Sequence, residues 1–207
     1  MVIREMTFDD IAEVAELERL YSQTPWDATG IFSWWMRDDT LFLVAGEELA
    51  EPAERIEEIS RKKDEETFVG NSDGSSGAER KETFAGNSDE SSGSAGATDD
   101  EEDYIPPVVY GYVGLVMVPY ESDITNITVS GECRRQGIAT ALLEELFRRC
   151  PEKGVTVIHL EVRESNAPAR ALYEKHGFII DGRRKNYYTD PAEDAILMTK
   201  TLSGDNN

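Results

Sequence analysis

The stretch Gly131–Cys150, "GECRRQGIATALLEELFRRC", places two arginines and a glycine directly before an amphipathic pattern. Apolar residues recur at helical spacing, which predicts a helix over 138–150 with one apolar face. A helix start offers free backbone N–H groups and the positive end of the helix dipole. Gly137 would let a ligand approach the backbone closely. The pattern therefore indicates an anion site, with a phosphate as the simplest ligand. The alternative is a surface turn with solvated arginines.

The segments on either side of this stretch have the pattern of buried strands. Residues 124–129 form a strand pattern that leads into the loop, and the apolar run "GVTVIHLEV" follows the helix. A strand, a glycine-containing loop and a helix make a phosphate-binding layout. However, the loop matches neither the G-x-x-x-x-G-K-S/T phosphate loop nor the G-x-G-x-x-G dinucleotide fingerprint.

The rest of the chain alternates between the apolar spacing of strands and that of helices, with strand patterns at both ends. This predicts a mixed α/β sheet. The expected strands cover residues 1–7, 40–47, 106–119, 123–130, 154–162, 178–188 and 193–202, and the expected helices cover residues 7–22, 31–38, 138–150 and 165–177.

The charge of the chain is extreme and unevenly distributed. The net charge is −21 over 207 residues, and residues 47–103 hold 19 of the 42 acidic and 6 of the 21 basic residues. This segment alone therefore carries −13. A basic face for nucleic acid is disfavoured, and an acidic protein attracts basic partners instead.

Residues 47–103 are rich in Glu, Ser, Gly and Asp and contain a short repeat. "ETFVGNSDGSSG" at 66–77 returns as "ETFAGNSDESSG" at 82–93. The repeat is too short and polar to bury a shared core, so we expect a disordered insert. Phe68 and Phe84 are either weak anchors for an unknown partner or isolated aromatics in a flexible loop. Residues 203–207 read as a flexible tail.

Cysteine content and the N-terminus indicate a cytoplasmic location. Cys133 and Cys150 belong to no metal-ligand pattern, so we expect two reduced thiols and no metal. The start "MVIREMTFDD" has no apolar signal-peptide run, and no apolar run reaches membrane-spanning length. We therefore expect a soluble protein with no membrane contact.

Four motifs together resemble the GNAT superfamily of N-acetyltransferases. "RRQGIA" at 134–139 resembles the acetyl-CoA signature of that family, and "LEVRESNAPARALYEKHGF" at 160–178 resembles the second half of its core. "TPWD" at 24–27 and "RKNYY" with "EDAILM" near the C-terminus are similar to the bacterial ribosomal-protein-alanine N-acetyltransferase branch. The resemblance covers roughly residues 1–46 and 104–202, and the insert departs from it.

The resemblance implies a fold and a cosubstrate. The fold would be a single GNAT-type domain, with a mostly antiparallel sheet of about seven strands, splayed central strands and about four helices. The cosubstrate would be acetyl-CoA, with its pantetheine arm between the splayed strands and its pyrophosphate on the N–H groups of Arg134–Thr140. The implied contacts are Ile127, Thr128, Val129, Arg134, Arg135, Gln136, Gly137, Ile138, Ala139, Thr140 and Asn166.

The resemblance also implies catalytic and acceptor-binding roles. Glu161 would be the general base and Tyr173 would protonate the departing thiolate. Without the resemblance, the first reads as a surface carboxylate and the second as a core aromatic. Asn166 is also expected to cap its helix. Trp26, Tyr187 and Tyr188 would line the acceptor cleft, or else are ordinary core or rim aromatics.

Three functions remain open on the sequence. The leading one is acetylation of a basic protein N-terminus. In the branch that this chain resembles, that N-terminus is the alanine of a ribosomal protein. The second keeps the fold but acetylates a small amine or a lysine. The third is a non-catalytic acetyl-CoA-binding module in which the insert is the functional part.

Overall fold

The computed structural model describes residues 1–48 and 106–202, which belong to one compact unit. The expectations for the insert at 47–103 lie outside the described residues, apart from Glu47 and Glu48, and so does the expected tail at 203–207. The domain boundaries at 46 and 104 therefore stay a prediction.

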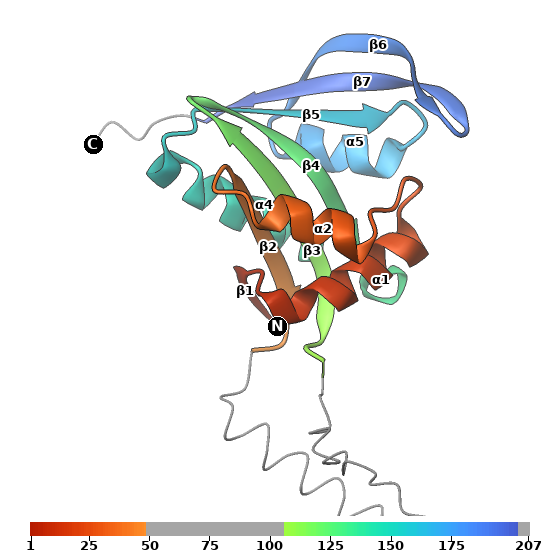
Figure 1. Cartoon of the computed structure of the whole chain (residues 1–207). Helices are drawn as coiled ribbons and strands as arrows, with labels where there is room; N and C mark the ends of the chain where they lie inside the picture. The colour runs from red at the N-terminus through yellow and green to blue at the C-terminus, as the bar shows by residue number, and fades with distance from the viewer. Residues whose placement is uncertain (49–105, 203–207) are drawn as a thin grey trace, which may run out of the picture. The chain divides into compact units, whose positions relative to one another are not determined.

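A seven-stranded sheet runs through the described residues in the order β1-β2-β3-β4-β5-β7-β6. Every neighbouring pair is antiparallel except β4 and β5, which are parallel. This confirms the predicted mixed, mostly antiparallel α/β fold (Figure 1). The strands are β1 (Val2–Glu5), β2 (Thr40–Gly46), β3 (Val109–Val118), β4 (Glu121–Val129), β5 (Val157–Arg163), β6 (Ile179–Thr189) and β7 (Ala192–Thr201).

Four α-helices in the described part of the chain cover the sheet, two on each face. They are α1 (Ile11–Tyr21), α2 (Ala28–Trp35), α4 (Ile138–Arg149) and α5 (Ala167–Lys175). Figure 1 shows α1 and α2 in front of the sheet and α4 behind it. Strand β2 illustrates why both faces need cover. Phe42 and Val44 pack in the cluster with α1 and α2, whereas Leu41 and Leu43 pack in the cluster with α4.

Two expected helix starts differ from the structure because of local capping. The first segment begins with a 3-10 turn (Phe8–Asp10) preceded by Thr7, and α1 itself starts at Ile11. The second helix starts at Ala28 rather than at residue 31. Its N-cap is Asp27, whose side chain accepts a hydrogen bond from the Gly30 N–H at 2.7 Å.

The central strands diverge halfway along their length. The β4–β5 pairing runs from Glu121 opposite Val157 to Ile124 opposite Leu160, and there it ends. Strand β4 continues to Val129 against β3, after a register shift that leaves Thr125 unpaired, while β5 continues against β7. The expected splay of the two strands is thus present, and it opens the sheet at its centre.

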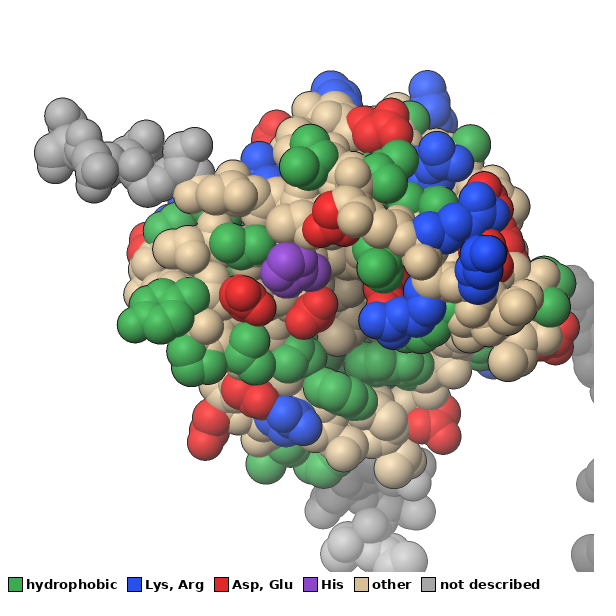
Figure 2. Space-filling model, turned by 90° about the horizontal axis from the view of Figure 1, so that it is seen from above, with side chains coloured by type: hydrophobic (Ala, Val, Ile, Leu, Met, Phe, Trp, Pro, Cys, Tyr) green, Lys and Arg blue, Asp and Glu red, His purple; other side chains and the backbone are tan. Residues whose placement is uncertain are grey.

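Both signs of charge lie on the described surface. On the face seen in Figure 2, Lys and Arg side chains gather towards one side, with Asp and Glu side chains among them and beside them. Several of the ion pairs join neighbouring strands, such as Arg183 on β6 with Asp194 on β7 at 2.7 Å.

Candidate active site

A cavity of about 920 Å³ lies where β4 and β5 diverge. Its wall comes from both strands, from the loop before α4 and the first turn of that helix, from α5, and from the end of α1 with the residues that follow it. The cavity thus joins segments from most of the described chain. Most of the expected site residues lie in its wall.

The β4 side of the cavity is a strand edge that lacks a partner strand. Ile127, Thr128 and Val129 line the cavity. Each is opposite a β3 residue on one side, from Val113 to Gly111, while β5 has already turned away on the other. Main-chain groups along this edge are therefore available to a bound molecule that can exchange hydrogen bonds as a strand does.

The loop before α4 holds two residues in the left-handed region, Arg135 with φ 63° and Gly137 with φ 85°. Gly137 is the N-cap, and the first helical N–H with a main-chain partner is that of Ala141, which donates to the Gly137 carbonyl at 2.9 Å. The N–H groups of the preceding turn have no helical acceptor. Backbone of this kind forms a concave donor surface for anions.

The expected cosubstrate residues around this loop lie mostly in the cavity wall. Arg134, Arg135, Gly137, Ile138, Ala139 and Thr140 line it. Gln136 is not among the lining residues, because its side-chain amide turns back to donate to the Glu132 carbonyl at 3.2 Å. Arg134 packs over the ring of Tyr21 at 5.4 Å, which joins this loop to the end of α1.

Glu161 lies on β5, just beyond the last residue paired with β4, and lines the cavity. Its carboxylate is 27% exposed and forms an ion pair with Arg184 of β6 at 2.8 Å. The hydrogen bond to Glu161, together with burial, raises the pKa of Tyr187. No local pattern pointed to the Arg184 partner, because the two residues meet only through the pairing of β5 and β6 with β7.

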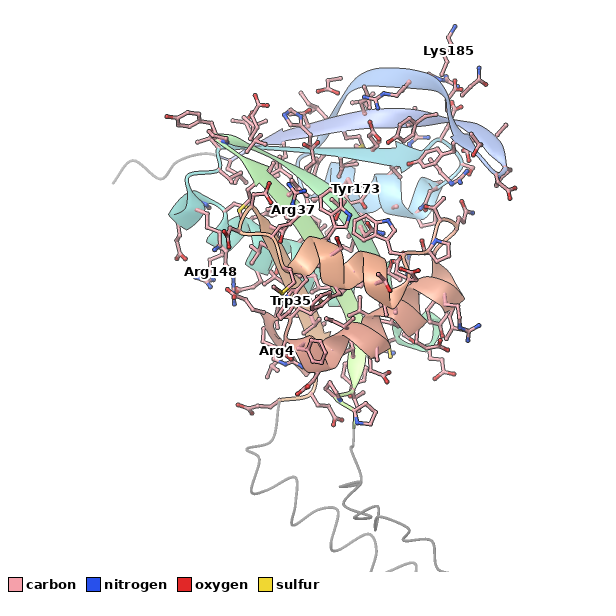
Figure 3. All side chains as sticks on the ribbon, viewed as in Figure 1. Arg4, Trp35, Arg37, Arg148, Tyr173 and Lys185 are labelled. Atoms are coloured by element: carbon pink, nitrogen blue, oxygen red, sulfur yellow. The ribbon has the colours of Figure 1, made fainter. Side chains whose placement is uncertain are left out.

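Tyr173 projects from α5 towards the part of the sheet where β4 and β5 diverge (Figure 3). It is 5% exposed, and its ring meets Phe178 edge-on at 5.7 Å. Burial, followed by the effect of Tyr188, raises the pKa of the Tyr173 hydroxyl above its ordinary value. The hydroxyl is therefore a weaker acid than that of an exposed tyrosine and holds its proton at neutral pH.

Asn166 does two things at the start of α5. Its side chain accepts a hydrogen bond from the Ala169 N–H at 3.3 Å, so the predicted N-cap is confirmed. It also lines the cavity. The cap fixes the direction of α5 and so the placement of Tyr173.

Only one of the three expected acceptor residues lines the cavity, although the rings of Tyr187 and Tyr188 meet edge-on at 5.1 Å. Tyr188 lines the cavity, whereas Tyr187 and Trp26 are not among its lining residues. The Trp26 ring stacks on Trp34 at 5.5 Å and packs against the core on the α1–α2 side of the sheet. In its place, Ser22, Gln23 and Thr24 of the α1–α2 loop lie in the wall.

Arg163 is a cavity residue that the sequence did not single out. It is 6% exposed, packs over the Tyr188 ring at 4.1 Å, and donates to the carbonyls of Asp190 and Pro191 at 3.0 Å each. It thereby fixes the turn between β6 and β7 against the end of β5. Its position directly after "LEV" was the available signal.

Three further observations on the described residues concern metal ligands, thiols and membrane spans. None of their Cys, His, Asp and Glu side chains form a group of three or more that could hold a metal ion. Cys133 lines the cavity, and burial raises the pKa of Cys150 to about 11. Within residues 1–48 and 106–202, the helices are too short or too polar to cross a membrane.

The parallel strands β4 and β5 diverge, and the start of α4, with its free N–H groups, lines the cavity at that point. The model of the acetyltransferase (GNAT) family matches residues 11–178, and the chain belongs to that family. Among curated proteins, the chain is 47% identical over 85 residues to the ribosomal protein bS18-alanine N-acetyltransferase of Escherichia coli (strain K12). That match covers 40% of this chain and 57% of the relative.

Another curated relative and two solved structures are also acetyltransferases or share the fold. The chain is 39% identical over 102 residues to the N-alpha-acetyltransferase of Saccharolobus solfataricus, covering 47% of this chain and 60% of that protein. The chain thus spans about 60% of the length of the curated relatives it matches. The crystal structure of the Escherichia coli ribosomal-protein-S18-alanine N-acetyltransferase has a TM-score of 0.63 at 24% identity, covering 100% of this chain and 97% of that one. Ard1 from Thermoplasma volcanium gives 0.62 at 18%, with 98% of each chain covered. These two structures share the fold.

Proposed function

We propose that this chain transfers an acetyl group from acetyl-CoA to the N-terminal α-amine of a protein. The observation that carries the proposal is that Glu161 and Tyr173 line the same cavity as the free N–H groups at the start of α4. A cosubstrate held by its phosphates at that helix start would extend along the open β4 edge. Its reactive end would then lie between the two side chains.

Different residues of the cavity would contact different parts of the cosubstrate. The N–H groups from Arg134 to Thr140 would hold the pyrophosphate, aided by the dipole of α4. The main chain of Ile127 to Val129 would hydrogen-bond the pantetheine arm, and Asn166 would contact it from α5. Gln136 is the one proposed contact whose side chain is turned away, so its contribution would come from its backbone.

In the proposed reaction, the acceptor nitrogen bonds to the acetyl carbonyl carbon and the carbon–sulfur bond breaks. The acceptor ammonium first loses one proton to Glu161, directly or through water, and Glu161 passes it to solvent. Glu161 then takes up the second proton from the attacking nitrogen as the amide forms. Tyr173 gives its hydroxyl proton to the departing thiolate. Solvent then returns a proton to Tyr173 and removes one from Glu161, so the chain is unchanged after each turnover. The ion pair with Arg184 holds the Glu161 carboxylate in place between turnovers.

An α-amine is the acceptor best suited to a carboxylate base. Its pKa lies near 8, against about 10.4 for lysine, so it gives up its proton more readily. Similarity to the alanine N-acetyltransferases points the same way, and we propose a ribosomal protein N-terminus as the acceptor. With a ribosomal protein as acceptor, the reaction would take place in the cytoplasm. The chain itself would make no direct contact with nucleic acid. Residues 1–46 with 104–202 would form the catalytic domain.

Lysine and small amines are the competing acceptors, and intact-mass analysis separates them. The purified chain is incubated with acetyl-CoA and a basic peptide that begins with alanine, beside the same peptide with a blocked N-terminus. We expect one acetyl group on the free peptide only. Acetylation of both peptides would show lysine transfer. No transfer with acetyl-CoA still bound would favour a small amine or a non-catalytic acetyl-CoA-binding module.

A further inference from the structure

A buried carboxylate lies between α1 and β4 and has no role in the reaction proposed above. Glu18 is fully buried. Its oxygens accept hydrogen bonds from Thr128 Oγ1 at 2.7 Å, Asn126 Nδ2 at 3.3 Å and the Trp26 N–H at 3.3 Å. No ion pair joins it to another described residue, so neutral donors alone compensate its charge. A buried charge is costly, and an apolar side chain would fill the same space without that cost.

Two of the three donors lie in the cavity wall, and the third follows loop residues that also line the cavity. Asn126 and Thr128 lie on β4, and both line the cavity. Trp26 ends the α1–α2 loop, whose residues Ser22 to Thr24 line it from the other side. A single carboxylate therefore ties this loop to the strand along which the cosubstrate would extend.

The donor count explains why the residue is a carboxylate. Three N–H and O–H groups donate to Glu18, and the buried Tyr112 hydroxyl also faces it. A carboxylate offers about four acceptor positions and no donor. A glutamine would offer one acceptor oxygen and would turn an N–H group towards at least one of the three donors. Hydrogen bonds to an ionised acceptor are also stronger than bonds between neutral groups.

We propose that Glu18 is a positioning residue for the acceptor. It holds the α1–α2 loop against β4, so that the first residues of the acceptor lie between the loop and the cosubstrate. The role rests on the proposed function, because it concerns the acceptor of that same reaction. It also requires that the loop, rather than Trp26, forms the acceptor side of the cavity.

The test compares Glu18→Gln with Glu16→Gln, a change on the same helix where the glutamate is exposed and paired with Arg19. We expect Glu18→Gln to raise KM for the alanine peptide about tenfold, the effect of weakening one charge-assisted hydrogen bond. KM for acetyl-CoA and the amount of acetyl-CoA bound should not change. Hydrogen exchange of residues 22–27, followed by mass spectrometry, should become faster. Glu16→Gln should match the wild type in every measurement.

A second variant covers the case in which Glu18→Gln does not fold. Thr128→Val removes the shortest of the three hydrogen bonds and nearly keeps the side-chain shape, so it should shift peptide KM and loop exchange in the same direction by about threefold. A folded variant with unchanged peptide KM, beside an active wild type, would overturn the inference alone. A wild type that acetylates no amine would instead overturn the proposed function, and the acceptor role of Glu18 with it.

Discussion

The two proposed catalytic side chains differ in how the protein holds them. Glu161 is partly exposed and fixed by Arg184, while Tyr173 is buried and protonated at neutral pH. The first can therefore exchange protons with an incoming amine and with solvent. The second can deliver a proton only inside the cavity. This division matches the opposite directions in which the two protons move in the proposed reaction.

We expect Glu161→Gln to lower kcat with the alanine peptide at least about 100-fold, and Tyr173→Phe at least about tenfold, since positioned acids and bases contribute rate factors of this order. Acetyl-CoA binding, measured by calorimetry, should stay within about twofold, because neither side chain is proposed to hold the phosphates. Glu164→Gln is the matched control, since that carboxylate pairs with Arg183 outside the cavity wall. Near wild-type rates in both variants would show that the roles are wrongly assigned.

At the scale of elements, the start of α4 depends on a glycine in the left-handed region. Gly137 has φ 85°, and a Cβ there would meet no atom within 4 Å. The space is therefore open, and the difficulty with any other residue is the backbone conformation itself. For an L-residue this conformation costs about 1–2 kcal/mol.

Gly137→Ala should raise KM for acetyl-CoA about tenfold, because relaxation of the backbone would turn the N–H groups at the helix start away from the phosphates. Gly154→Ala is the control, with φ 78° and equally open space in a turn outside the cavity wall. The melting temperature should fall by a similar amount in both variants, and only Gly137→Ala should lose affinity for acetyl-CoA. Equal KM values in the two variants would remove Gly137 from the phosphate site.

The first strand and the first helix are joined by a buried ion pair. Both oxygens of Asp10 accept from the Arg4 guanidinium at 2.6 and 2.7 Å, and the Thr7 N–H donates to the same carboxylate at 2.8 Å. Burial alone would raise the pKa of Asp10, but the hydrogen bonds from Arg4 and Thr7 outweigh it and the pKa is lowered. The carboxylate thus stabilises the folded state in its ionised form.

Asp10→Asn should lower the free energy of unfolding at pH 7 by about 3 kcal/mol, because Arg4 would lose its partner in a buried site. Since the folded-state pKa is depressed, this stabilisation is present above the ordinary value near 3.9 and is lost as pH falls through the folded-state pKa. The difference from wild type in urea unfolding should therefore shrink below about pH 4. Asp39→Asn, which breaks an exposed pair with Arg37, should leave stability unchanged. A constant difference across the pH range would contradict the explanation.

On the scale of the whole molecule, β2 and β3 stay paired up to their ends beside the insert. Gly46 pairs with Val109, and the Glu47 N–H donates to the Val108 carbonyl at 3.1 Å. The ends of β2 and β3 thus stand as neighbours in an antiparallel pair. A short turn is enough to connect two such strands.

Replacing residues 49–105 with an Asn-Gly turn should therefore leave kcat/KM for the alanine peptide within about twofold at 0.15 M salt, where distant exposed charges are largely screened. The melting temperature should stay the same. Comparing a basic peptide with a neutral one at low and high salt adds the control. A loss of activity confined to the basic peptide at low salt would show that the insert recruits basic partners.

Most elements followed from the sequence because their signals are local. The apolar runs of β2 and β7, the apolar face of α4 and the Asn166 cap each depend on residues a few positions apart. The same locality allowed two errors. The start of α2 depends on the Asp27 cap, and the segment after Thr7 begins as a 3-10 turn, and neither is visible in the apolar spacing alone.

The sequence by itself determined the family and the order of strands and helices, and its motifs named 13 of the 30 residues in the cavity wall. Motifs and periodicities are carried by neighbouring residues. Only the tertiary structure decided where β4 and β5 part, that Arg184 holds Glu161, and that Trp26 faces the core. It also decided that Glu18 meets Thr128, 110 residues further along the chain. Such contacts have no local pattern, since they arise only when the sheet pairs and the helices cover it.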